Sequence, residues 1–233
     1  ALPDGVPRPG EHPIPAGGGR LCALPAPGRR LDDMSLQAIG LSFSYRGRRR
    51  TAVLDQIDLT IERGERVGLL GPSGRGKTTL CKLLAGYEKP TGGQVLLDGK
   101  PLDSYPGCCP VQLIWQHPES AVDPLLRLGE TLYEAGPVED WVLDALHIAP
   151  GWLERYPAEL SGGELQRFCI ARALRPQTRY VLCDEMTAML DLVTQAQMWE
   201  FLLRQAQERA LGLVIVSHNT ALMDRLCARE FAL

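Results

Sequence analysis

A glycine-rich loop at residues 71–79 is the feature that most restricts how this chain can fold. Its residues are Gly71, Pro72, Ser73, Gly74, Arg75, Gly76, Lys77, Thr78 and Thr79. The loop fits the pattern GxxxxGK[ST], in which a phosphate-binding turn joins a strand to a helix. A short apolar segment at 66–70 precedes it, and Leu80, Leu83 and Leu84 after it recur at helical spacing. The flanking sequence therefore supplies the context that the pattern needs.

The chemistry of phosphate binding explains the residue types in this loop. Glycines let backbone N–H groups converge on phosphate oxygens, and the start of the following helix adds the positive end of its dipole. Lys77 is expected to reach the β- and γ-phosphates, and the Thr78 hydroxyl to coordinate Mg²⁺. A plain glycine-rich turn is the simpler interpretation, but the strand and helix on either side disfavour it. We therefore expect Mg-ATP to bind here.

Composition and charge are those of an ordinary globular protein. The 233 residues are 45% hydrophobic and 23% charged, and the net charge of −3 gives no broad basic surface for nucleic acid. The longest apolar run, residues 211–216, is far shorter than the roughly 20 residues of a membrane helix, and no signal peptide is recognisable. Seven scattered cysteines without metal-ligand spacing suit a reducing compartment. Any membrane role is expected to come through a partner.

The chain divides into an amino-terminal extension and one larger domain at 34–233. Residues 1–33 hold seven prolines and six glycines without an apolar period, so we expect this extension to be disordered. Residues 38–45 and 52–61 predict two strands, with the basic residues 46–50 forming an exposed hairpin tip.

Strand and helix signals alternate along the rest of the domain. Further strands are expected at 94–98, 111–116, 180–184 and 213–217. Residues 129–159 are expected to be mainly helical, and a later helix is expected to bury Met198, Phe201 and Leu202. This alternation predicts an α/β fold with right-handed crossovers and a largely parallel core sheet, preceded by an antiparallel hairpin.

Two acids and a histidine follow apolar strand segments. Asp184 and Glu185 end one segment, and His218 follows the segment at 213–217. Ligands of α/β sheets bind at the carboxyl ends of the strands, where one acid could hold magnesium through water and the other could polarise an attacking water. Alone, this pattern is ambiguous, because Asp-Glu often marks only a strand end and a lone histidine is more often structural.

A second helix start able to bind an anion occurs at residues 160–167. Ser161 is expected to cap this helix, and Gly162 and Gly163 expose backbone N–H groups. A domain with one phosphate loop does not need a second one for its own nucleotide. We therefore expect this helix start to serve a nucleotide that another copy holds.

Together these residues resemble the ATP-binding-cassette (ABC) ATPases, the nucleotide-binding subunits of transporters. The resemblance runs from about residue 36 to 233, with spacings too short for the coiled-coil insertion of the DNA-repair branch. It implies a P-loop NTPase fold with a mainly parallel core sheet, an antiparallel β subdomain and a helical signature subdomain at about 117–175. The residues that carry it are the loop at 71–79, Gln116, Leu-Ser-Gly-Gly-Glu at 160–164, the acids at 184–185 and His218.

The resemblance implies a role for each matching residue in hydrolysis. Tyr45 would stack on adenine, and the loop at 71–79 would hold the phosphates. Gln116 would contact Mg²⁺ and the attacking water, and would sense the transmembrane partner. Glu185 would act as the general base, and His218 would bridge the γ-phosphate and a dimer interface.

A metal site and a head-to-tail dimer are implied in the same way. Mg²⁺ would be held by Thr78, by Gln116 and, through water, by Asp184. Asp191 would lie in the loop that crosses the dimer interface. The residues that would bind the γ-phosphate of the opposite subunit are Ser161, Gly162, Gly163 and Glu164.

Two residues depart from the family pattern. Glu164 stands where the family usually has glutamine, which is tolerable because the backbone and Ser161 would make the main contacts. Met186 replaces the usual proline after Glu185, which leaves the rigidity of that loop open.

Segments at 115–124, 155–163 and 190–196 resemble a finer group, the oligopeptide, dipeptide and nickel importer ATPases. The resemblance implies import of nickel, metal chelates or peptides through a separate permease, with an extracytoplasmic substrate-binding protein. The chain would be a peripheral subunit on the cytoplasmic side of the membrane, paired with an identical chain or a sister ATPase. A non-transport ATPase, such as a subunit of a phosphonate-degrading complex, is the alternative. A binding module with little turnover is disfavoured, because Glu185 and His218 are both present.

Overall fold

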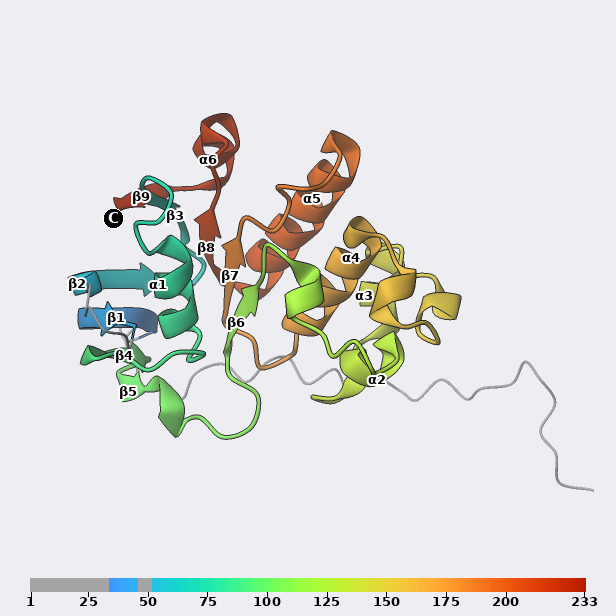
Figure 1. Ribbon diagram of the computed structural model, residues 1–233, viewed down its shortest axis with the longest axis horizontal. Helices are drawn as coiled ribbons and strands as arrows, with labels where there is room; N and C mark the ends of the chain where they lie inside the picture. Colours follow the sequence, from blue (N-terminus) through green and yellow to red (C-terminus); the bar gives the residue numbers. More distant parts are fainter. Residues whose placement is uncertain (1–33, 46–51) are drawn as a thin grey trace, which may run out of the picture.

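The computed structural model describes residues 34–45 and 52–233, and a five-stranded sheet lies at its centre (Figure 1). The strand order is β6-β7-β8-β3-β9, and every neighbouring pair is parallel. All residues of β7 and β8 are buried, as expected for parallel strands covered on both faces. The predicted parallel core sheet is therefore confirmed. Its strands are β6 (Val111–Ile114), β7 (Tyr180–Asp184), β8 (Gly212–Val216), β3 (Arg66–Leu70) and β9 (Arg229–Ala232).

An antiparallel sheet in the order β2-β1-β4-β5 forms the second layer. The hairpin predicted from 38–45 and 52–61 is β1–β2, and the strand predicted at 94–98 belongs to this sheet as β4. A Cβ on Gly93 would lie 2.3 Å from the carbonyl oxygen of Gly40, so the pairing of β4 with β1 requires glycine there. The strands are β1 (Ser35–Ser44), β2 (Ala52–Glu62), β4 (Gly92–Leu97) and β5 (Lys100–Pro101).

Six α-helices pack around the sheets in the described part of the chain. In Figure 1, α1 and the antiparallel sheet lie on one side of β6, β7 and β8, and α2 to α5 lie on the other. Of these described helices, none has both the length and the apolar character needed to cross a membrane. The helices are α1 (Lys77–Leu84), α2 (Leu128–Tyr133), α3 (Asp140–Ala145), α4 (Gly162–Ala173), α5 (Leu192–Arg209) and α6 (Thr220–Leu226).

Two predictions, a disordered extension at 1–33 and an exposed basic hairpin tip at 46–50, concern residues outside the described ranges. Residues 129–159, predicted to be mainly helical, form short helical pieces in place of long helices: α2, α3 and two single 3₁₀ turns, joined by loops. The sequence Gly136-Pro137 and the prolines at 150 and 157 interrupt any longer helix, since proline lacks an N–H and restricts the residue before it.

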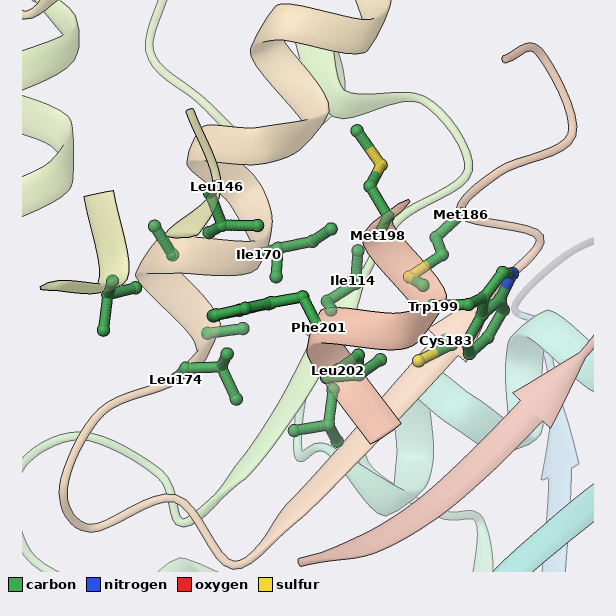
Figure 2. Packing of buried hydrophobic residues seen from close by; sticks show 14 of the residues in the cluster. Ile114, Leu146, Ile170, Leu174, Cys183, Met186, Met198, Trp199, Phe201 and Leu202 are labelled. Carbon is green, nitrogen blue, oxygen red and sulfur yellow. The ribbon is translucent and has the colours of Figure 1, made fainter. Parts of the chain in front are cut away.

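The parallel sheet has a hydrophobic core on each of its two faces. Along β7, Val181 and Cys183 point into the core formed with α4 and α5, whereas Tyr180 and Leu182 point into the core formed with α1 and the antiparallel sheet. Figure 2 shows the first core, in which Met198, Phe201 and Leu202 are buried as predicted.

A buried arginine joins two helices within the helical layer. Arg175, just after α4, is only 1% exposed, and burial lowers its pKa. Its guanidinium donates to the carbonyl oxygens of Leu132, Gly136 (2.6 Å) and Pro137 (3.4 Å), and its Nε donates to that of Arg172 (3.0 Å). These bonds occupy carbonyl groups at the end of α2 and so tie α2 to the end of α4.

Thr131 on α2 provides a stability test. Its side chain is 4% exposed, and its hydroxyl has no hydrogen-bond partner within the described ranges. A buried polar group left unpaired costs about 1–3 kcal/mol. Thr131→Val removes the hydroxyl and keeps the shape, so the Tm measured by circular dichroism should rise by about 2–6 °C.

Thr178→Val is the matched control for this substitution. Thr178 is also buried, but its hydroxyl accepts a hydrogen bond from the Arg175 N–H (3.1 Å) and donates one to the Ala173 carbonyl (2.7 Å). The Tm of Thr178→Val should therefore fall. Equal shifts in the two variants would contradict the explanation from the unpaired hydroxyl.

Candidate active site

The phosphate loop lies between β3 and α1, as predicted. Gly76 has a φ of 96°, and a Cβ there would lie 2.9 Å from Leu54 Cδ2, so this position requires glycine. Lys77 is buried, and its Nζ donates to the carbonyl oxygens of Gly71 (2.7 Å) and Pro72 (3.1 Å). The turn of the chain thus holds the ammonium group at the loop, where its charge can act on an anion.

Thr78 at the start of α1 and Asp184 at the end of β7 are joined by a side-chain hydrogen bond. Asp184 is only 4% exposed, and burial raises its pKa. The hydrogen bond from Thr78 and the positive charges of Lys82 and Lys77 oppose this rise, and the neighbouring Glu185 adds to it. A hydroxyl and a carboxylate together provide the oxygen ligands that Mg²⁺ prefers. These residues therefore fit the metal that the sequence predicted.

Glu185 is the centre of a second group. Its Oε2 accepts a hydrogen bond from Gln116 Nε2 (3.2 Å), and its Oε1 lies 2.8 Å from His218 Nε2. Gln116 follows β6, and His218 follows β8, so three strands deliver these side chains to one place. A carboxylate held on both oxygens in this way can accept a proton from a water molecule.

The backbone of Glu185 is itself constrained. Its φ is 49°, a left-handed conformation that is uncommon outside glycine, and its N–H donates to the Val216 carbonyl (3.1 Å). A hollow of about 230 Å³ adjoins the carboxylate, and its lining includes Thr187, Gln195, Trp199 and His218.

Tyr45 lies directly after β1, with its hydroxyl 3.4 Å from Thr79 Oγ1. The residue is 48% exposed, and its ring packs edge-on against Phe43, with the centroids 4.8 Å apart. An exposed aromatic face beside the phosphate loop can stack on a flat ligand ring.

Ser161 caps α4 as predicted, and its hydroxyl accepts a hydrogen bond from the Glu164 N–H (3.3 Å). Glu164 completes the capping box, because its Oε2 accepts from the Ser161 N–H (2.7 Å) and hydroxyl (2.8 Å). The hydrogen bond from the Ser161 backbone lowers the pKa of Glu164 most, and the hydroxyl adds to the effect. The glutamate that departs from the family pattern therefore stabilises the helix start.

Asp191 caps α5 and lies on an exposed apolar surface. Its Oδ1 accepts from the N–H groups of Val193 and Thr194, both at 3.0 Å. Beside it, Met189, Leu192 and Val193 are 72%, 80% and 67% exposed. A cluster of large apolar side chains in solvent is typical of an interaction surface.

The structure thus brings the predicted residues together in two groups, Thr78 with Asp184 and Gln116 with Glu185 and His218. The side-chain hydrogen bonds that join Ser161 and Glu164 lie within their own helix start. Sequence reasoning did not identify Thr187, Gln195 or Trp199, which line the hollow beside Glu185. The available signal was spacing, since residues 191, 195 and 199 recur every four positions along α5.

Known proteins resemble this chain in sequence. The family model described as ABC transporter matches residues 54–188. The nickel import ATP-binding protein NikE of Rhodospirillum rubrum is 36% identical over 199 residues, which cover 78% of this chain and 72% of that protein.

Solved structures share the fold. The dimeric structure of MJ0796, a bacterial ABC transporter cassette, superposes with a TM-score of 0.74 at 24% identity and covers 85% of this chain and 94% of that chain. The structure of cbiO1 from Clostridium perfringens, described as part of the ABC transporter complex cbiONQ, gives a TM-score of 0.67 at 23% identity over 84% of this chain and 83% of its own.

The raised pKa of Asp184 generates a stability prediction. Because the folded chain raises this pKa above its ordinary value of 3.8, ionisation of Asp184 destabilises the fold. The cost is present above the raised pKa and disappears as the pH falls toward 3.8. Asp184→Asn should therefore raise the Tm of the nucleotide-free chain by about 2–5 °C at pH 7.5, with the gain shrinking toward pH 4.

An exposed aspartate on β2, Asp55, provides the control. Asp55→Asn should leave the Tm almost unchanged across the same pH range. A gain for Asp184→Asn that stays constant with pH would count against burial of the charge as its cause.

Proposed function

Because the chain belongs to the ABC transporter family and is an ATP-hydrolysing subunit of that family, we propose that it drives a membrane importer whose cargo is nickel. The single observation that supports the hydrolytic role is the Glu185 carboxylate, which Gln116 and His218 contact from neighbouring strands. The cargo is inferred from the relative that shares 36% identity and is a nickel import protein.

In the proposed reaction, Glu185 accepts a proton from the water that attacks the γ-phosphate. Gln116 and His218 orient the carboxylate, because each contacts a different oxygen of Glu185. Lys77 and the N–H groups of the loop at 71–79 hold the phosphates and offset their negative charge. Tyr45 stacks on the adenine ring.

The magnesium ion belongs to the same proposal. Thr78 and Gln116 would bind Mg²⁺ directly, and Asp184 would hold one of its water molecules. The ion supplies charge neutralisation at the β- and γ-phosphates. Burial of Asp184 supports this role, because a carboxylate that is costly to ionise alone gains from a nearby cation.

We further propose that two such subunits pair head to tail. In this dimer, Ser161, Gly162, Gly163 and Glu164 of each chain would contact the γ-phosphate held by the other. The α4 start supports the proposal, since its first N–H groups remain available beside the Ser161 cap. Asp191 would cross the interface, where the exposed Met189, Leu192 and Val193 would be covered.

The permease is proposed to dock beside Gln116. After Gln116, the chain continues into Leu125 and Leu126, which are 82% and 37% exposed. A hollow of about 200 Å³, lined among others by Tyr87, Glu134 and Arg172, opens between β6 and α4. A cytoplasmic segment of a membrane subunit would fit this mixed apolar and charged surface. The chain would then be a peripheral protein of the inner membrane, served by an extracytoplasmic substrate-binding protein.

Glu185→Gln tests the hydrolytic role. The amide keeps the size but cannot accept the proton, so ATP turnover should fall by about 10²- to 10⁴-fold. ATP binding should persist, and light scattering in ATP should detect a dimer that no longer dissociates. As a control, Glu230→Gln on exposed β9 should keep wild-type turnover. Undiminished hydrolysis in Glu185→Gln would show that Glu185 is not the proton acceptor.

The action of one chain on the other's nucleotide is tested in the same assay. Ser161→Arg should suppress hydrolysis because it fills the contact with the opposite nucleotide. The isolated monomer should still bind ATP with wild-type affinity in a titration. Wild-type turnover in this variant would show that the signature residues do not act across a dimer.

The cargo is tested in cells that carry the whole complex. Radioactive nickel uptake should require the wild-type chain and should fall to background with Glu185→Gln, while membrane subunits co-purify with both. Uptake of peptides or metal chelates in place of free nickel would replace the proposed cargo. Purification with soluble partners alone would instead favour the non-transport alternative.

A further inference from the structure

The hydroxyl of Thr187 is held by two donors from α5. Gln195 Nε2 donates to Thr187 Oγ1 at 2.8 Å and to the Thr187 carbonyl at 3.3 Å. Trp199 Nε1 donates to the same Oγ1 at 3.2 Å. Thr187 and Trp199 are each only 4% exposed, so water does not readily replace these bonds.

One face of α5 supplies both donors to Thr187. Asp191, Gln195 and Trp199 follow one another at intervals of four residues, so they lie in a row along the helix. Asp191 caps the first turn, and the next two residues of the row bind Thr187. The Leu190 N–H also donates to the Thr187 carbonyl (3.2 Å). The loop between β7 and α5 is therefore bound to the helix that follows it.

The other end of this loop is Glu185. The Ala188 N–H donates to the Glu185 carbonyl at 3.0 Å, which makes residues 185–188 one turn. The left-handed φ of Glu185 costs free energy and persists only where the surroundings fix it. Met186, between Glu185 and Thr187 in the sequence, is 2% exposed and belongs to the same core as Trp199 (Figure 2). Proline would restrict the backbone here, and methionine does not.

We propose that Thr187, Gln195 and Trp199 form a positioning clamp that keeps the Glu185 carboxylate aimed at its water. The clamp supplies by hydrogen bonding the rigidity that Met186 cannot supply by backbone restriction. This inference rests on the proposed function, because it assumes that Glu185 is the proton acceptor. It assigns no contact with nucleotide to the three residues, so turnover depends on the clamp and ATP binding does not.

Two conservative substitutions remove the hydrogen bonds and keep the packing. Trp199→Phe removes one donor to Thr187, and Thr187→Val removes the acceptor while preserving the branched shape. The kcat for ATP hydrolysis should fall by about 5- to 10-fold in Trp199→Phe and about 10- to 30-fold in Thr187→Val. The KM for ATP should stay within about 2-fold, because Lys77 and the phosphate loop are unchanged.

Matched controls separate the clamp from general effects of packing. Thr187→Ser keeps the hydroxyl and should recover most of the lost turnover. Trp152→Phe makes the same exchange in a tryptophan that borders the same core beside Phe168, and it should keep wild-type kcat. All assays are made well below the Tm of each variant. If Thr187→Val gives no folded protein, the comparison of Trp199→Phe with Trp152→Phe decides.

Several results would overturn the clamp. Wild-type kcat in both Trp199→Phe and Thr187→Val, an equal loss in Thr187→Ser, or a rise in KM that accounts for the whole effect would each do so. Glu185→Gln, assayed in parallel, distinguishes failure of the clamp from failure of the proposed function. If it keeps turnover, the proposed function fails; if it abolishes turnover while the clamp variants stay active, only the clamp fails.

Discussion

The parallel register of β3, β8, β7 and β6 is the constraint on which the rest of the site depends. Val216 pairs with Asp184 on one side and with Leu69 on the other, so the acid and the start of the phosphate loop lie at the same level of the sheet. Ile114 pairs with Cys183, which brings Gln116 to that edge as well. Strands that run in the same direction place their carboxyl ends side by side, and the chemistry collects there.

Much of this fold could be predicted because the strong signals are local. The glycine pattern at 71–79 and the apolar strands at 180–184 and 213–217 each specify a conformation over a few residues. The division of 129–159 into short helical pieces was harder to predict. Apolar residues there have helical spacing, but the prolines at 137, 150 and 157 divide the segment, so that only short helices form.

The sequence predicted which residues form the site better than it predicted the contacts between them. Sequence patterns identified Gln116, Glu185 and His218. They did not indicate that the Glu185 carboxylate contacts both other side chains, because those contacts depend on the register of three strands. The bonds of Trp199 and Gln195 to Thr187 depend on how α5 turns relative to β7, and no local pattern specifies that angle. Glu164 is different: its role in the capping box follows from its spacing of three from Ser161.

Strand β7 has a further consequence for how the molecule comes apart. Since Val181 and Cys183 belong to one core and Tyr180 and Leu182 to the other, neither core can lose its packing without exposing a face of the same strand. The layers on either side of the sheet are thus linked through five consecutive buried residues. Their amide hydrogens should exchange with solvent only in the global opening, and the helical and β layers should unfold in one cooperative transition.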